Sequence, residues 1–157
     1  MADKATASSS ASIFLDEIKS SIGGNLNYEP ADTGDKWVFA EIAVNADANL
    51  LSTTHSFLKS GTALVVGDKI RWIAIKNLST TATDGVCISL DGGTPAYDLA
   101  DGIFIGAGEI VMLKVPNVTC DLMHAASVTM DGTYGYPASA NSDPVNVHVA
   151  AIIDDVS

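Results

Sequence analysis

Basic residues are scarce in this sequence of 157 residues. Lys and Arg number 8 against 19 Asp and Glu, which gives a formal net charge of -11 at pH 7, and charged residues make up 17% of the chain. Soluble domains typically carry about 25% charged residues, so Ser, Thr, Asn, Gly and Ala must cover much of this surface. A chain with this excess of negative charge repels a phosphate backbone. Nucleic-acid binding is therefore excluded as a function.

Cysteine is also rare, and the histidines are scattered. Cys87 and Cys120 are too few for a disulfide scaffold, and neither belongs to a Cys-x-x-Cys pair of the kind found in redox and zinc sites. We expect both to be buried thiols. The histidines, His55, His124 and His148, lie far apart in the sequence, so no zinc site is expected, and we place them at the surface or in an interface.

Long apolar runs are missing as well. No run approaches the roughly 18 apolar residues of a membrane span, and residues 1–12 lack the basic region, apolar core and cleavage site of a secretory signal. We therefore expect a soluble product, made in the cytoplasm, that does not bind membranes. Its 157 residues fit one domain and leave no room for two full cores.

Motifs for catalysis and for bound groups are absent too. The sequence contains no Gly-x-Ser-x-Gly elbow and no glycine-rich phosphate loop. Asp91, Asp98 and Asp101 could supply oxygen ligands to calcium, but their spacing is not that of an EF-hand loop, and turn formation explains them better. We predict a protein that is not an enzyme, with no catalytic residue, no cofactor and no metal.

The N-terminal part of the chain differs in composition from the rest. Residues 1–12 are rich in Ala, Ser and Thr, which predicts a flexible arm. Four apolar residues then recur near helical spacing: Ile13, Phe14, Ile18 and Ile22. Because Ser12 can cap such a segment and two glycines can end it, the pattern predicts a short helix and linker within 13–35. The alternative is an extended arm whose apolar residues insert into a partner.

Residues 36–157 read as strands separated by turn residues. Eight short apolar runs are expected as strands, at 37–44, 62–66, 69–76, 86–90, 103–105, 110–115, 126–130 and 145–153. Gly, Asp, Asn and Pro punctuate them, and no helical crossover lies between them. The fold class predicted is therefore all-β: an antiparallel β-sandwich or jelly roll of about eight strands, with an N-terminal arm and one short helix.

Alternation within two of these runs predicts which side chains point inward. Val38, Ala40, Ile42 and Val44 form one apolar face in 37–44. In 145–149 the inward residues are Val145, Val147 and Val149, whereas Asn146 and His148 point outward.

Aromatic residues offer one possible ligand site. Trp37 and Trp72 lie inside strands, so they are expected in the core. Tyr134 and Tyr136 lie in a loop, where exposed rings could stack on a sugar.

Charge is distributed unevenly along the chain. Residues 1–76 carry 9 acids and 7 bases, whereas residues 77–157 carry 10 acids and the single base Lys114. Lys69, Arg71 and Lys76 gather around one strand, with Lys69 and Arg71 expected on one face and Trp72 on the other. This patch is either a solvated sheet face or a surface that docks onto an acidic partner. We expect the nearly neutral half to face the partner and the acidic half to face solvent.

Four segments carry a resemblance to a known group of proteins. They are IRWIAIKN at 70–77, GVCISLDGG at 85–93, IGAGEIVMLK at 105–114 and VNVHVAAI at 145–152. Together they resemble the β-sandwich of small virion proteins of tailed bacteriophages, and most of all the head decoration, or cement, proteins. The resemblance covers half to two-thirds of the chain and leaves out residues 1–12 and 14–37.

The resemblance implies a structural protein of the virion, made in the host cytoplasm. Such a protein sits on the outer capsid surface, binds the major capsid protein between capsomers and stabilises the head against the packaged DNA. It also implies a homo-oligomer, most often a trimer. The candidate docking residues are Ile13, Phe14, Ile18, Lys69, Arg71 and Lys76. The alternatives are a tail, neck or fibre protein of a phage, and a carbohydrate-binding module that uses Tyr134 and Tyr136.

Overall fold

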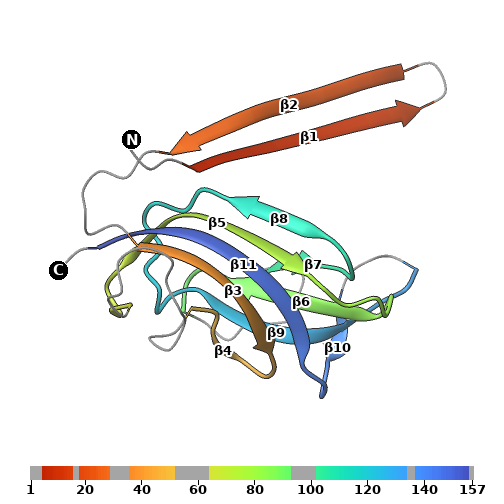
Figure 1. Ribbon diagram of the computed structural model, residues 1–157. Helices are drawn as coiled ribbons and strands as arrows, with labels where there is room; N and C mark the ends of the chain where they lie inside the picture. Colours follow the sequence, from red (N-terminus) through yellow and green to blue (C-terminus); the bar gives the residue numbers. More distant parts are fainter. Residues whose placement is uncertain are drawn as a thin grey trace. The chain divides into compact units, whose positions relative to one another are not determined.

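The chain consists of two compact units, Met1–Thr33 and Gly34–Ser157. The computed structural model describes residues 5–15, 18–28, 36–51, 64–92, 102–133 and 137–155. Within these ranges every regular element is a β-strand, every strand pairing is antiparallel, and there is no helix (Figure 1). None of these residues therefore forms a helix that could cross a membrane. The prediction of an all-β antiparallel protein is confirmed.

The first unit contains a β-hairpin. Strand β1 (Ala5–Leu15) pairs with β2 (Ile18–Tyr28), from Leu15 opposite Ile18 at the turn to Ala5 opposite Tyr28 at the open end. The helix predicted within 13–35 is therefore wrong for the described residues, and most of the predicted flexible arm lies in β1.

The hairpin has a physical reason in the side chains beside the apolar residues. Ser and Thr compete for backbone hydrogen bonds inside a helix but fit a strand well. In β1 the alternate residues Thr6, Ser8, Ser10 and Ser12 are all exposed. The two glycines expected to end a helix lie instead within β2, opposite Ser9 and Ser10. The Ser and Thr residues at alternate positions from 6 to 12 favoured strands over the helix that the spacing of four apolar residues predicted.

The second unit contains nine strands among its described residues. They are β3 (Lys36–Val44), β4 (Ala48–Asn49), β5 (Lys69–Asn77), β6 (Asp84–Ser89), β7 (Ile103–Ile105), β8 (Ile110–Leu113), β9 (His124–Met130), β10 (Pro137–Ala140) and β11 (Val145–Asp154). One sheet has the order β3-β11-β5-β8, and we call it the β11 sheet. The other has the order β10-β9-β6-β7, with β4 also paired to β9, and we call it the β9 sheet. Figure 1 shows the two sheets as two layers.

The strand pairs are nested along the chain. β3 pairs with β11, β4 with β9, β5 with β8, and β6 with β7. Two further pairings, β5 with β11 and β6 with β9, join these pairs into sheets. The strand β10 adds to β9 outside this series. The order is that of one long two-stranded ribbon folded back on itself.

A single hydrophobic cluster draws on both sheets. The β11 sheet contributes Val38, Ile73, Ile75, Val147 and Val149, and the β9 sheet contributes Val86, Ile88, Ile105 and Ala125. Burying a Val or Ile side chain contributes about 1.5–3 kcal/mol, so this cluster is the main source of stability. The predicted inward positions at 38–44 and 145–149 are confirmed, since Val38, Val44, Val145, Val147 and Val149 are buried.

Both cysteines are buried thiols outside any disulfide, as predicted. Cys87 packs with Val128 and Met130 in a smaller cluster, and Cys120 belongs to the main one. Burial raises the pKa of Cys87 to about 11. Burial, helped by the negative charge of Asp68, raises the pKa of Cys120 to about 12.

One predicted strand, 62–66, is not a strand in its described part. Leu64 to Val66 lie outside any strand and lead through a turn at Val66–Gly67 into β5. The backbone N–H of Asp68 donates to the carbonyl of Val65 at 3.0 Å, and the Asp68 carboxylate accepts from the N–H of Val65 at 2.8 Å. These two bonds close the turn, and they leave Val65 and Val66 exposed.

Candidate interaction surface

The face of the β11 sheet that points away from the core carries three rows of side chains. Residues opposite each other on neighbouring strands share a face. The register therefore gives a first row of Trp37, Ile152 and Trp72, a second of Phe39, Ala150, Ala74 and Met112, and a third of Glu41, His148, Lys76 and Ile110. We call these residues the outer face.

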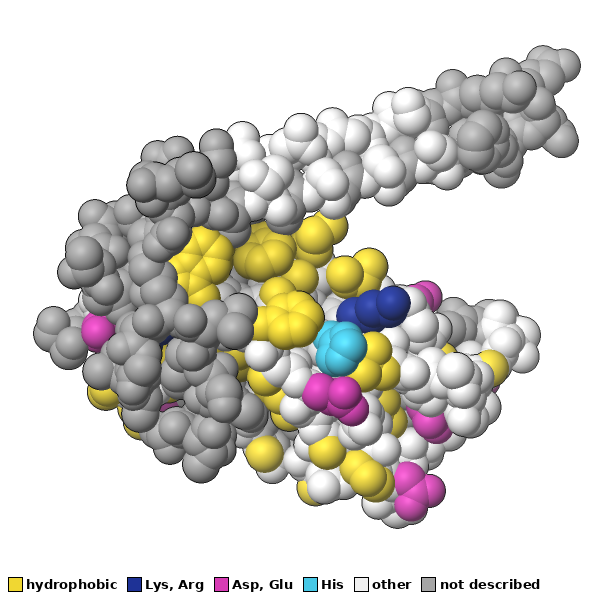
Figure 2. All heavy atoms as spheres, in the orientation of Figure 1, with side chains coloured by type: hydrophobic (Ala, Val, Ile, Leu, Met, Phe, Trp, Pro, Cys, Tyr) yellow, Lys and Arg dark blue, Asp and Glu magenta, His cyan; other side chains and the backbone are white. Residues whose placement is uncertain are grey.

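The outer face is rich in large apolar side chains. Phe39 is 59% exposed and Ile110 is 58% exposed, and both tryptophans are partly exposed. Figure 2 shows hydrophobic side chains gathered over β3, β11 and β5, beside a histidine, a basic and an acidic side chain. The expectation that Trp37 and Trp72 lie in the core is therefore wrong. Large rings are usually buried, but the register puts both on the outward positions of their strands.

Three residues of the third row, Glu41, His148 and Lys76, are polar, and Glu41 contacts its polar neighbours. His148 Nε2 lies 3.5 Å from a carboxylate oxygen of Glu41, and Asn146 donates its side-chain amide to the other oxygen at 3.0 Å. The ring of Phe39 stands 6.0 Å from that of His148. His148 and Asn146 point outward as predicted. A charged row at the border of an apolar field is typical of a protein-binding surface, which has an apolar centre and a polar rim.

The three bases predicted to form a patch are separated by a β-bulge. The register between β5 and β11 shifts at Ile152/Ile153, so Lys69 is opposite Asp154 while Trp72 is opposite Ile152. Because Asp154 and Ile152 share a face of β11, Lys69 and Trp72 share a face too. The expectation that they lie on opposite faces is wrong, since a bulge inserts one residue and reverses the alternation.

Acids of the second half of the sequence turn toward bases of the first half. Arg71 forms an ion pair with Asp154, and Lys36 forms one with Asp155. Lys76 is exposed in the third row of the outer face. Of the three predicted bases, the register puts Lys76 in the third row and Lys69 beyond the first row, opposite Asp154.

Several predicted site residues lie either in the hairpin of the first unit or outside the described residues. Ile13 and Phe14 lie in β1 and Ile18 in β2, where the structure describes their backbone. Tyr134, Tyr136 and His55 lie outside the described residues, as do Asp98 and Asp101.

The hollows described in this unit are small. Two hollows, of about 160 and 170 Å³, lie beside β4, one lined by Leu51, Leu64 and Cys120 and the other by Ile42 and Ala125 among others. Sites for small molecules usually measure about 300–1,000 Å³. Among the described residues, no group of His, Cys, Asp and Glu is arranged to hold a metal ion.

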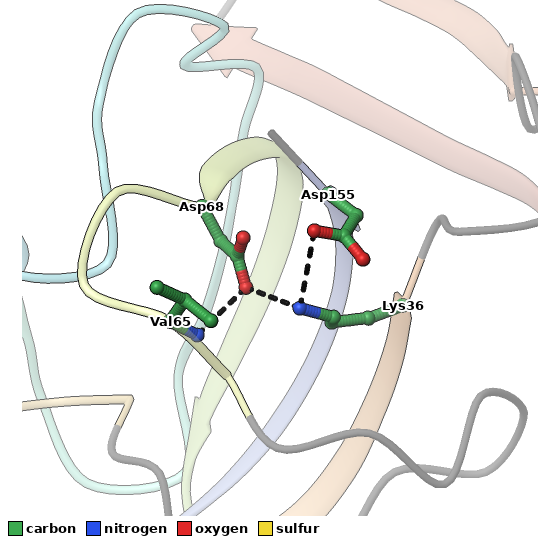
Figure 3. Close-up of polar contacts among 4 residues, drawn as sticks. All are labelled: Lys36, Val65, Asp68 and Asp155. Atoms are coloured by element: carbon green, nitrogen blue, oxygen red, sulfur yellow. Dashed lines mark hydrogen bonds and ion pairs between the residues drawn. The ribbon is translucent and has the colours of Figure 1, made fainter. Parts of the chain in front are cut away.

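The buried ion pair between Lys36 and Asp68 was not predicted from the sequence. Lys36 is 1% exposed and Asp68 is buried completely, and Lys36 Nζ lies 2.6 Å from Asp68 Oδ2 (Figure 3). Asp155 approaches the same nitrogen at 3.5 Å. The alternation of the strand does predict that Lys36 points inward, because it lies two and four residues before the inward residues Val38 and Ala40. Lysine is almost never fully buried unless it is paired, and nothing in the sequence revealed its partner.

Comparison of the chain with protein-family models, with curated proteins and with solved structures found no match.

Proposed function

We propose that this chain is a structural protein of a bacteriophage virion, and within that class a capsid decoration protein. It would bind the outer surface of the head between major capsid subunits and stabilise the shell. The observation that carries the proposal is the outer face, where Phe39 and Ile110 are exposed and both tryptophans partly exposed beside a charged border. Large exposed apolar patches mark protein-binding sites. We assign the outer face to assembly of the chain, and the resemblance at 70–77, 85–93, 105–114 and 145–152 gives the class of that assembly, a virion.

We further propose that the second unit is a jelly-roll β-sandwich. The nested pairs β3–β11, β4–β9, β5–β8 and β6–β7 support it, because a folded two-stranded ribbon of eight strands generates that architecture. Jelly rolls are frequent in viral capsid proteins but also occur in lectins and cupins. The fold is therefore compatible with the virion role, but it is not evidence for that role.

The outer face is best matched by a second copy of the same chain. Across the third row the order is Glu41, His148, Lys76, from negative to positive. A half-turn about an axis parallel to β11 lays a second copy on the first so that each Glu41 faces Lys76 of the other copy. The same rotation sets the large Phe39 against the small Ala74. A two-fold contact needs such a self-complementary surface.

Charge reversal tests this contact in the full chain. We expect the protein to form oligomers, and Glu41→Lys to raise the dissociation constant by about tenfold or more, because like charges then face each other twice. Adding Lys76→Glu should restore assembly. Asp143→Lys makes the same charge change in an exposed loop outside the three rows and serves as the control. Light scattering gives the mass; a monomeric wild type would contradict the proposal, and a trimer would contradict the two-fold contact.

Capsid binding tests the proposed role. We expect the purified protein to bind expanded, DNA-free capsids of its phage saturably, with density on the outer head surface in electron micrographs. Labelling of tail, neck or fibre would favour those roles instead. Failure to bind any part of the virion would remove the proposal.

A further inference from the structure

The end of the β11 sheet holds an unusual buried contact between Lys36, the first residue of β3, and Asp68, which precedes β5. Figure 3 shows the lysine nitrogen pointing at the Asp68 carboxylate, with Asp155 on its other side. Asp68 Oδ2 receives both Lys36 Nζ at 2.6 Å and the N–H of Val65 at 2.8 Å. The other oxygen, Oδ1, is buried and has no hydrogen-bond partner among the described residues.

The resting state of this group is an ammonium between two carboxylates. Burial acts to lower the pKa of Lys36, but the hydrogen bonds and negative charges of Asp68 and Asp155 outweigh it, so the pKa is raised. Isolating such charges from water is costly, and a buried carboxylate oxygen without a donor adds to that cost. Transfer of one proton along the existing 2.6 Å hydrogen bond turns the pair into an amine and a carboxylic acid.

We propose that Lys36 and Asp68 condense to an intramolecular isopeptide bond. The neutral Lys36 nitrogen attacks Cγ of the protonated Asp68 carboxyl, a C–N bond forms, and a C–O bond breaks. Asp155 accepts a proton from the nitrogen and delivers one to the departing oxygen, which leaves as water. One ammonium and one carboxylate thus become one amide and one water molecule, and Asp155 ends as it began. No oxidant or cofactor is required.

Three features of the site favour this reaction once the proton has moved from Lys36 to Asp68. The two reacting groups are already in contact, which gives a high effective concentration. Their side chains are 1% and 0% exposed, so water for the reverse hydrolysis is kept away. The third carboxylate lies 3.5 Å from the nitrogen, on a different strand end. Condensation also removes two opposite charges from the protein interior.

The bond would join strands that are not neighbours. β11 lies between β3 and β5, and its register sets Ile153 opposite Lys36 and Asp154 opposite Lys69. A bond from Lys36 to Asp68 therefore clamps three strands at one end of the sheet. This inference does not depend on the proposed function.

Intact mass spectrometry of the purified full chain tests the proposal. We expect the chain to be lighter than its sequence by one water molecule, and a protease digest to contain a branched peptide that joins Lys36 to Asp68. The variants Lys36→Met and Asp68→Ala should have their full mass. A wild-type chain at full mass would overturn the proposal.

Two further variants test the role of Asp155, and the Lys36→Met variant distinguishes the isopeptide bond from other reactions that lose water. Asp155→Asn keeps both reacting groups but removes the proton carrier, so we expect most molecules of this variant to have the full mass of their sequence. Asp154→Asn, one residue earlier, should lose water like the wild type. A succinimide formed at an Asp-Gly pair also loses water. It would persist in Lys36→Met and give no branched peptide, and that result would count against the isopeptide bond.

Discussion

The two faces of the β11 sheet are built from the same strands, yet their side chains meet different surroundings. On the inner face, Ile75 and Val149 are completely buried in the cluster shared with the β9 sheet. On the outer face, Phe39 and Ile110 are equally apolar but more than half exposed. The outer face also carries charges in a fixed order and small residues between large ones. The difference shows that apolar content alone does not make a face part of the core; coverage by the second sheet does.

Shortening an isoleucine on each face should give the largest contrast. We expect Ile75→Ala to lower the free energy of unfolding by about 2–5 kcal/mol, because it leaves a cavity in the shared cluster. Ile110→Ala, on the outer face of the adjacent strand, should change it by less than about 0.5 kcal/mol. Urea unfolding of both variants measures this. Similar losses from the two would mean that the outer face is also covered within one chain.

Two adjacent residues at the end of β5 sharpen the comparison further. Asn77 is buried, and its amide donates to the carbonyls of Asp84 at 3.1 Å and Ile105 at 3.2 Å, which joins the two sheets. We expect Asn77→Ala to destabilise the fold by about 1–3 kcal/mol, because it leaves these buried groups unpaired. Lys76→Ala, on the outer face, should be close to neutral. Thermal unfolding compares them, and equal midpoints would contradict the role of Asn77.

Alkaline pH should destabilise the fold through its two buried thiols. The folded state holds the thiol protons of Cys87 and Cys120 more tightly than the unfolded chain, whose thiols titrate near 9.0. Stability is therefore complete below pH 9.0 and falls above it, by about 1.4 kcal/mol per thiol for each pH unit until the folded pKa is reached. Urea unfolding between pH 8 and 11 measures the slope. A variant with both cysteines replaced by alanine should lose most of it; an unchanged slope would assign the effect to other groups.

The alternation of apolar and polar residues made the inner face predictable from the sequence. The outer face was not predicted, because a β-bulge and two large aromatic residues were misinterpreted. Valine at 145, 147 and 149, alternating with Asn146 and His148, leaves one arrangement with the valines inside. The bulge near Arg71 depends on the partner strand, which no local pattern reveals, so the face of Lys69 was misassigned. The tryptophans were misplaced because their size suggests burial. Lys36 was missed because its partner Asp68 lies 32 residues away in the sequence.

The hairpin shows the same limit on a smaller scale. Ile13, Phe14 and Ile18 satisfy a helical period and also fit strands. Short apolar runs are ambiguous between the two, and length and neighbouring residues decide. Here the Ser and Thr residues of β1 carried the deciding signal.

The nested order of the strands sets a constraint on how the second unit can fold. β11 is the last described strand, yet it lies between β3 and β5 and pairs with both. While the ribosome is still making residues 145–154, those two strands have no shared neighbour, and each exposes an open edge that could pair with another chain. Such distant pairing also slows folding. A chain cut short before residue 145 should therefore aggregate rather than remain as a smaller folded protein.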